Sequence, residues 1–161
     1  MNTYDKFLPE DIPDWQLPFW KSLEAHAVAV QRCGACGTFR YVPKELCPAC
    51  QAFEADWVPV AGEGTIYTYT VVRRGPTKAF QADAPYVIAH VTMSEGFRMI
   101  GRLLDVDPAD VAIGAAVRVR YLDVTDEWTL LAFELAPDRG RADEGSPAAA
   151  LVPGTTDVTP R

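Results

Sequence analysis

Cys33-Gly-Ala-Cys36 and Cys47-Pro-Ala-Cys50 decide the fold of this chain, and ten residues separate the two pairs. In each pair, the two intervening residues let both sulfur atoms point to the same side of a tight turn. Two Cys-x-x-Cys pairs at this separation are typical of a structural zinc ribbon, in which four thiolates surround one ion tetrahedrally. Gly37 follows the first pair and suits a turn with positive φ, whereas Gln51 makes the second turn less favourable. We therefore predict a closed site of four cysteines that leaves no coordination position for a substrate.

Other uses of the four cysteines stay open at this point. A rubredoxin-type iron site is also tetrahedral and built only from sulfur, so iron is the alternative to zinc. Two disulfides would need an oxidising compartment, and the first five residues show neither the basic cluster nor the apolar run of a signal peptide. A redox dithiol would need only one Cys-x-x-Cys pair. Structural Zn²⁺ is the interpretation that the spacing favours.

Length and charge restrict the classes of function. The chain has 161 residues, and its 22 acidic and 15 basic residues give a net charge of −7. This length suits one compact domain with an attached module. The negative charge disfavours nucleic-acid binding, which depends on neutralising phosphates. No apolar run approaches the roughly 20 residues that a membrane helix needs, so we expect a cytoplasmic protein without membrane contact.

The regions around the cysteines divide the chain into four segments and predict a mainly β protein. Residues 1–30 read as a polar arm followed by an amphipathic helix from Phe19 to Val30. The rubredoxin-like ribbon occupies residues 31–54, and strands follow from residue 55 to residue 136. The last stretch, residues 137–161, has no aromatic residue and is rich in Pro, Gly, Ser and Thr, so we predict a disordered tail.

Five segments between residues 55 and 136 have the alternation or the β-branched and aromatic content of strands. They are residues 65–72, 86–93, 98–104, 117–121 and 129–135. Turn signals such as Glu95-Gly96 separate them, and no long helical pattern intervenes. Five short strands predict a small closed barrel, for which a five-stranded OB-fold is the best match, although the strand count also allows an SH3-like barrel.

Two groups of side chains are candidates for binding. The first is a stretch from Gly64 to Ala82 that contains cations but no acid, so it could meet an anion such as a nucleotide phosphate; an ordinary solvated loop is the alternative. The second is an apolar stripe on the expected helix, which could pack on its own domain or on another protein. The members are Arg73, Arg74, Lys78 and Phe80 for the loop, and Trp15, Phe19, Trp20 and Leu23 for the stripe.

The order of helix, ribbon and barrel resembles a zinc-ribbon/OB-fold family of small proteins encoded beside thiolase-like enzymes. The resemblance covers residues 18 to about 136 and departs from the family pattern at Gln51. It rests on Pro18-Phe19-Trp20, Cys33-x-x-Cys36-Gly37, Cys47-Pro48-x-Cys50, Trp57, Gly62-x-Gly64-Thr65, Pro85-Tyr86 and Ile113-Gly114.

The resemblance implies an accessory subunit that binds acyl-CoA through its barrel and associates with a thiolase-type enzyme. Family partners include ketothiolases, hydroxymethylglutaryl-CoA-type synthases, acyltransferases and retro-aldol lyases of sterol side-chain degradation. The condensing or cleaving residues then belong to the partner, so we expect no catalysis by this chain alone. In that case the cationic loop with Phe80 faces the CoA phosphates, and the helix stripe contacts the partner.

Two other hypotheses remain. The first is a single-stranded nucleic-acid-binding OB-fold with a structural ribbon, in which Tyr67 and Tyr69 would be the platforms on which bases stack. The net charge disfavours this hypothesis. The second is an independent enzyme, which turnover of acyl-CoA by the isolated chain would reveal.

Overall fold

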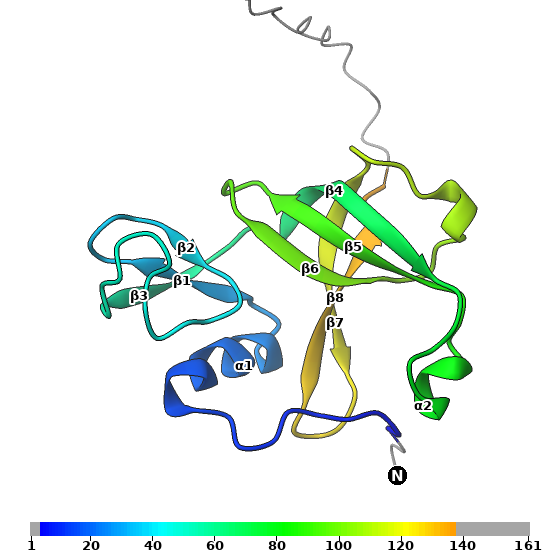
Figure 1. Ribbon diagram of the computed structural model, residues 1–161, viewed down its shortest axis with the longest axis horizontal. Coiled ribbons are helices and arrows are strands. Elements are labelled where there is room, and N and C mark those ends of the chain that lie inside the picture. The colour runs from blue at the N-terminus through cyan, green and yellow to red at the C-terminus, as the bar shows by residue number, and fades with distance from the viewer. Residues whose placement is uncertain (1–3, 138–161) are drawn as a thin grey trace, which may run out of the picture.

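The computed structural model describes residues 4–137 and confirms the mainly β class (Figure 1). Except for Pro137, the predicted disordered tail lies outside the described residues. The helical elements are short: η1 (Asp14–Gln16), α1 (Leu17–Glu24), α2 (Lys78–Gln81) and η2 (Pro108–Asp110). The strands are β1 (Ala29–Cys33), β2 (Phe39–Arg40), β3 (Ala55–Pro59), β4 (Glu63–Val72), β5 (Tyr86–Met93), β6 (Arg98–Leu103), β7 (Ala116–Asp123) and β8 (Thr129–Leu135). None of the described helices is long and apolar enough to cross a membrane.

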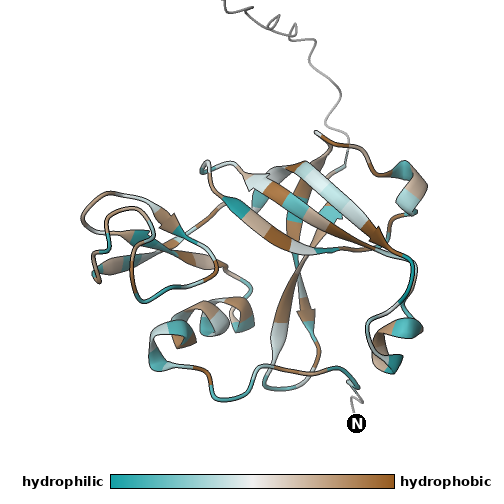
Figure 2. Cartoon of the chain, viewed as in Figure 1, coloured by the Kyte–Doolittle hydropathy of each residue, from teal (hydrophilic) through white to brown (hydrophobic). Residues whose placement is uncertain are grey.

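Strands β4 to β8 form the predicted five-stranded barrel. Its strand order is β4-β5-β6-β8-β7, and β7 pairs with β4 to close it. The β6–β8 pair is parallel and the other pairs are antiparallel. This strand order is that of an OB-fold, so the predicted OB-fold is confirmed and the SH3-like barrel is excluded. Figure 2 shows hydrophobic and hydrophilic bands alternating along these strands, as expected where one face of each strand meets the core.

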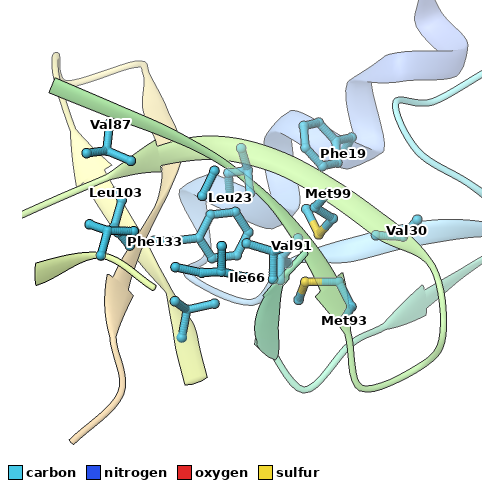
Figure 3. Close-up of a cluster of buried hydrophobic side chains, with 14 residues drawn as sticks. Phe19, Leu23, Val30, Ile66, Val87, Val91, Met93, Met99, Leu103 and Phe133 are labelled. Atoms are coloured by element: carbon cyan, nitrogen blue, oxygen red, sulfur yellow. The ribbon is translucent and has the colours of Figure 1, made fainter. Parts of the chain in front are cut away.

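One continuous hydrophobic core joins the barrel to the preceding helix and ribbon (Figure 3). Phe133 is fully buried within it, and Phe19 and Leu23 of α1 belong to the same cluster. Gly101 on β6 allows a close approach, because a Cβ atom there would lie 2.9 Å from the Phe133 ring. The stripe on the helix therefore packs on its own domain, which is one of the two alternatives left open by the sequence.

The N-terminal helix is shorter than the predicted range from Phe19 to Val30. Helix α1 ends at Glu24, His26 takes a positive φ of 51°, and β1 begins at Ala29. Val30 is buried in β1, which pairs with β3 over five residues and carries Cys33 to its position. The pairing of β1 outweighed the helical periodicity that the apolar residues suggest.

The ribbon sheet has the strand order β2-β1-β3 and lies beside the barrel (Figure 1). We expected strands from residue 55 onward to build the barrel, but β3, which contains Trp57, pairs with β1. The barrel strands begin at Glu63. The third strand of the ribbon sheet, β3, is therefore part of the segment that leads into the barrel.

Candidate metal centre and cationic loop

The four cysteine sulfur atoms gather at one end of the ribbon sheet. All four lie within 4.8 Å of one another, and the Cys33–Cys50 and Cys36–Cys47 Sγ pairs are both 3.6 Å apart. Cys33 and Cys47 are buried, whereas Cys36 and Cys50 are exposed. The structure thus brings together every residue of the predicted metal shell.

The donor set fits a four-coordinate metal ion. Metal–sulfur bonds of about 2.3 Å in a tetrahedral shell place neighbouring sulfurs about 3.8 Å apart, close to what the ribbon shows. A disulfide would need a separation of about 2.05 Å. A metal held by four thiolates has no open position, so it supplies folding energy and not chemistry on a substrate.

Both Cys-x-x-Cys turns close in the same way. The Gly37 N–H donates to the Cys33 carbonyl and the Gln51 N–H donates to the Cys47 carbonyl, each at 2.9 Å. Gly37 has a φ of 74° and Gln51 a φ of 61°. Gln51 therefore takes the left-handed conformation, in which a residue with a Cβ atom is strained, and the less favourable second turn stays a prediction.

A buried arginine, which no motif in the sequence marks, acts on this cluster. The Arg40 guanidinium, helped by backbone N–H groups, lowers the pKa of the Cys33 thiol to about 6. Burial alone would lower the pKa of Arg40, but the Cys33 and Cys47 sulfurs raise it above its ordinary value. The Arg40 guanidinium thus favours the thiolate form of Cys33, which is the form that binds metal.

The cationic loop connects β4 to β5. Arg73, Arg74 and Lys78 are all exposed, and the last of them begins α2. A shallow groove on this loop is lined by Arg74, Gly75, Pro76, Thr77, Lys78 and Gln81. Gly75 lets the loop fold tightly onto α2, because a Cβ atom there would lie 2.5 Å from the carbonyl carbon of Phe80. The three cations therefore occupy one compact segment.

Phe80 lies in α2, where Lys6 of the N-terminal arm contacts it. Its ring is 6.3 Å from that of Tyr86, and the Lys6 Nζ atom lies 5.4 Å from its centroid. Lys6 also lies 3.4 Å from Asp83, which accepts a 2.7 Å hydrogen bond from Arg102. These contacts attach the arm beside the loop, which adds a cation that the sequence analysis did not associate with it.

The predicted partner-contact residues fall into two groups. Phe19 and Leu23 are buried in the core of the chain, so they are not exposed for a contact with another protein. Trp15 and Trp20 are half-buried. Trp20 lies at an apolar hollow that Tyr41, Val42, Pro43, Leu130 and Leu131 also line.

The predicted stacking platforms are not free rings. Tyr69 packs against the core. The Arg98 guanidinium covers one face of Tyr67 at 3.4 Å from the ring centroid. This arrangement does not favour the nucleic-acid alternative, which needs open aromatic faces.

Comparisons with known proteins agree with both parts of the fold. Residues 20–55 match the ChsH2 rubredoxin-like zinc ribbon domain, and residues 57–122 match the ChsH2 C-terminal OB-fold domain. A DUF35 domain-containing scaffold protein of Methanocaldococcus jannaschii is 36% identical over 110 residues, which are 67% of this chain and 77% of that protein. The chain belongs to the ChsH2/DUF35 family.

Other relatives in this family are longer or have a solved structure. The 3-oxo-4,17-pregnadiene-20-carboxyl-CoA hydratase alpha subunit of Mycobacterium tuberculosis is 39% identical over 72% of this chain, which spans 36% of that protein. A probable enoyl-CoA hydratase alpha subunit of Thermomonospora curvata is 37% identical over 73% of this chain, which spans 37% of that protein. The chain therefore spans little more than a third of these two relatives. A solved chain described as Ltp2-ChsH2(DUF35) aldolase has a TM-score of 0.69 and 33% identity, over 79% of this chain and 98% of that chain.

Proposed function

We propose that this ChsH2/DUF35 chain is a non-catalytic acyl-CoA-binding and scaffold subunit of a thiolase-fold enzyme in acyl-CoA metabolism, with lipid and sterol substrates included. The partner would be a thiolase, an acyltransferase or a retro-aldolase. The observation that carries the proposal is the likeness to a ChsH2(DUF35) chain from a structure described as an aldolase, over 98% of that chain. The scaffold name of the Methanocaldococcus jannaschii relative supports it.

The metal centre supports a scaffold role and not a catalytic one. We propose Zn²⁺ as the ion held by the four cysteines, since the matched ribbon domain is described as a zinc ribbon. The ion would hold the two Cys-x-x-Cys turns together and stabilise the ribbon beside the barrel. Reactions would then occur on residues of the partner.

The cationic loop is the proposed contact with the phosphates of CoA. Arg73, Arg74 and Lys78 are exposed on one segment, and arginine and lysine are the side chains that bind phosphate best. Phe80 would hold this segment in position through its contacts with Tyr86 and Lys6. The CoA thioesters in the names of two relatives agree with this ligand class.

Calorimetric titration with coenzyme A tests this contact. The full-length chain, alone and with its partner enzyme, is compared with a variant carrying Arg73→Ala, Arg74→Ala and Lys78→Ala. A charge-assisted hydrogen bond contributes about 1.5–3 kcal/mol, so the variant should bind at least roughly tenfold more weakly. Lys44→Ala, at an exposed position outside the barrel, is the control for the loss of a surface cation. Equal affinity of the loop variant and the wild type would overturn the assignment.

The partner contact is proposed for the segment that η1 and α1 form. Since Phe19 and Leu23 serve the core, Trp15 and Trp20 carry this proposal. Trp20 also packs edge-on against Trp128 at 5.2 Å, so its replacement would disturb the chain itself. Trp15→Ala is therefore the sharper test, and we expect weaker binding to the partner with an unchanged unfolding transition. Unchanged binding of the partner would place the contact elsewhere.

A further inference from the structure

The two Cys-x-x-Cys turns share one backbone pattern. In the first turn, the Cys33 N–H donates to the Thr38 carbonyl at 2.9 Å, and in the second the Cys47 N–H donates to the Ala52 carbonyl at the same distance. The hydrogen bonds that close the two turns are also equal in length. Thr38 and Ala52 therefore hold equivalent positions, each two residues after the last cysteine of its turn.

The two turns differ in the side chain at this position. Thr38 is half-buried, and its hydroxyl oxygen lies 3.2 Å from Cys36 Sγ. Ala52 has no hydrogen-bonding group in its side chain. Within residues 4–137, the Cys50 Sγ atom has a side-chain neighbour at hydrogen-bond distance only in the Cys33 sulfur. Cys36 and Cys50 are otherwise alike, because both are exposed and each lies 3.6 Å from a buried sulfur of the other turn.

In the metal-bound shell, the proton of the contact between Thr38 and Cys36 must come from threonine. Cysteine ligands bind metal as thiolates, so the Cys36 sulfur has no proton to donate. A threonine hydroxyl can donate or accept, and the Thr38 O–H therefore donates to the Cys36 sulfur. A hydrogen bond to an anionic group is stronger than one between neutral groups. One exposed ligand of the shell thus receives a hydroxyl donor that the other lacks.

We propose that Thr38 is a positioning residue of the metal centre that holds Cys36 in the shell, so that Cys50 is the first ligand to leave when an electrophile attacks. Partners of this kind orient metal ligands, and an O–H group that shares the lone pairs of a thiolate makes it a weaker nucleophile. The other two ligands are buried, and access does not decide between Cys36 and Cys50 because both are exposed. The inference rests on the proposed metal centre and not on the CoA or scaffold function.

Alkylation of the zinc-loaded full-length chain with N-ethylmaleimide tests this order. The reagent is uncharged, so the exposed Arg32 beside the first turn does not attract it. The thiolate sulfur adds to the carbon–carbon double bond, the neighbouring carbon takes a proton from water, and the Zn–S bond breaks. Peptide mass spectrometry after partial reaction gives the product at each cysteine. We expect Cys50 to react roughly five times faster than Cys36, the factor that corresponds to one hydrogen bond of ordinary strength.

Variants at the two equivalent positions separate the hydroxyl from the shape of the turn. Thr38→Val keeps the shape and removes the O–H, so Cys36 and Cys50 should react at similar rates. Thr38→Ser keeps the O–H and should retain the wild-type ratio, which a role of the side-chain shape alone does not predict. Ala52→Ser places a hydroxyl in the second turn and should slow the reaction of Cys50. A chromogenic chelator measures the bound Zn²⁺ of each variant before the reaction and the Zn²⁺ released during it.

The wild-type chain decides the proposal even where a variant does not fold. Equal rates at Cys36 and Cys50, or a faster reaction at Cys36, would overturn it. A folded Thr38→Val variant that keeps the wild-type ratio would do the same. In these cases the chain still binds Zn²⁺, whereas a chain that binds no metal would overturn the metal centre together with the inference.

Discussion

The hydroxyl oxygen of Tyr121 in the barrel accepts a 2.9 Å hydrogen bond from the backbone N–H of Val28, just before the ribbon. The His26 ring stacks on Tyr121 with centroids 4.9 Å apart, and its Nε2 lies 2.8 Å from Asp123 Oδ1. Strand β7 therefore holds the turn between α1 and β1. This attachment sets how the ribbon sits beside the barrel.

Tyr121→Phe should lower the free energy of unfolding by about 1–2 kcal/mol, because the Val28 N–H loses its acceptor. Val28 is buried, so water does not readily replace the hydroxyl. Urea unfolding of the metal-loaded protein measures the change. Tyr67→Phe, at a ring that is 49% exposed, is the control and should change the value by less than about 0.5 kcal/mol. Equal effects of the two substitutions would contradict the role given to Tyr121.

Gln51→Gly should stabilise the metal-loaded chain. Gln51 has a φ of 61°, a conformation that costs a residue with a Cβ atom about 1–2 kcal/mol. The greater freedom of glycine in the unfolded chain offsets part of this, so we expect a gain of about 0.5–1 kcal/mol. Denaturant unfolding with saturating Zn²⁺ is the measurement. Gly37→Ala should have the opposite effect at the equivalent position, and a destabilised Gln51→Gly variant would show that the Gln51 side chain contributes more than its strain.

Gly101→Ala should destabilise the barrel, since the new methyl group would lie 2.9 Å from the fully buried Phe133 ring. Overpacking of this kind typically costs about 1–3 kcal/mol. Gly34→Ala is the matched control, because the nearest atoms would lie 3.8 Å away, in ordinary contact. Thermal unfolding of both variants compares them directly. Equal melting temperatures would mean that the side chains around Gly101 can move to accommodate the added methyl group.

Asp83→Asn should lower the free energy of unfolding at neutral pH and have little effect on it in acid. The hydrogen bond from Arg102, with Lys6 nearby, lowers the pKa of Asp83 below its ordinary value of 3.8. A carboxyl with a lowered folded pKa stabilises the protein above its unfolded pKa, and this contribution is lost as the pH falls through the folded value. The urea midpoints of variant and wild type should therefore differ at pH 7, begin to converge below about pH 4, and coincide once the pH is below the folded pKa of Asp83.

Asp126→Asn is the control for this pH series, because Asp126 is an exposed carboxyl of the β7–β8 loop. Its midpoint should follow that of the wild type at every pH. A constant difference between Asp83→Asn and the wild type across the series would show that the contribution of Asp83 does not come from its charge.

Local patterns accounted for most of the fold. The expected strands at residues 86–93 and 129–135 have the same bounds as β5 and β8. The side chains of β5 alternate between buried and half-buried positions, which is a property of the strand itself, whereas Ala132 and Phe133 of β8 are both buried. The Cys-x-x-Cys spacing was equally informative, because each turn is closed by a hydrogen bond within five residues.

Features that depend on distant partners were not predictable in the same way. The end of α1 depends on β1 pairing with β3, which lies more than twenty residues further along the chain. The stripe of Phe19 and Leu23 was visible, but its periodicity does not say which surface covers it. In the sequence alone, Arg40 looks like an ordinary surface arginine. Its burial depends on hydrogen bonds to carbonyl groups between residues 44 and 54.

Affinity purification of the tagged full-length chain from lysate of its own source cells, with mass spectrometry of stoichiometric partners, tests the scaffold claim most directly. If the chain is a scaffold subunit, a thiolase-fold enzyme should be recovered in a fixed ratio to it, and the reaction of that enzyme would identify the pathway step. Purified partner and chain should then re-form the complex. Recovery of nucleic-acid machinery, or of no protein in stoichiometric yield, would contradict the claim.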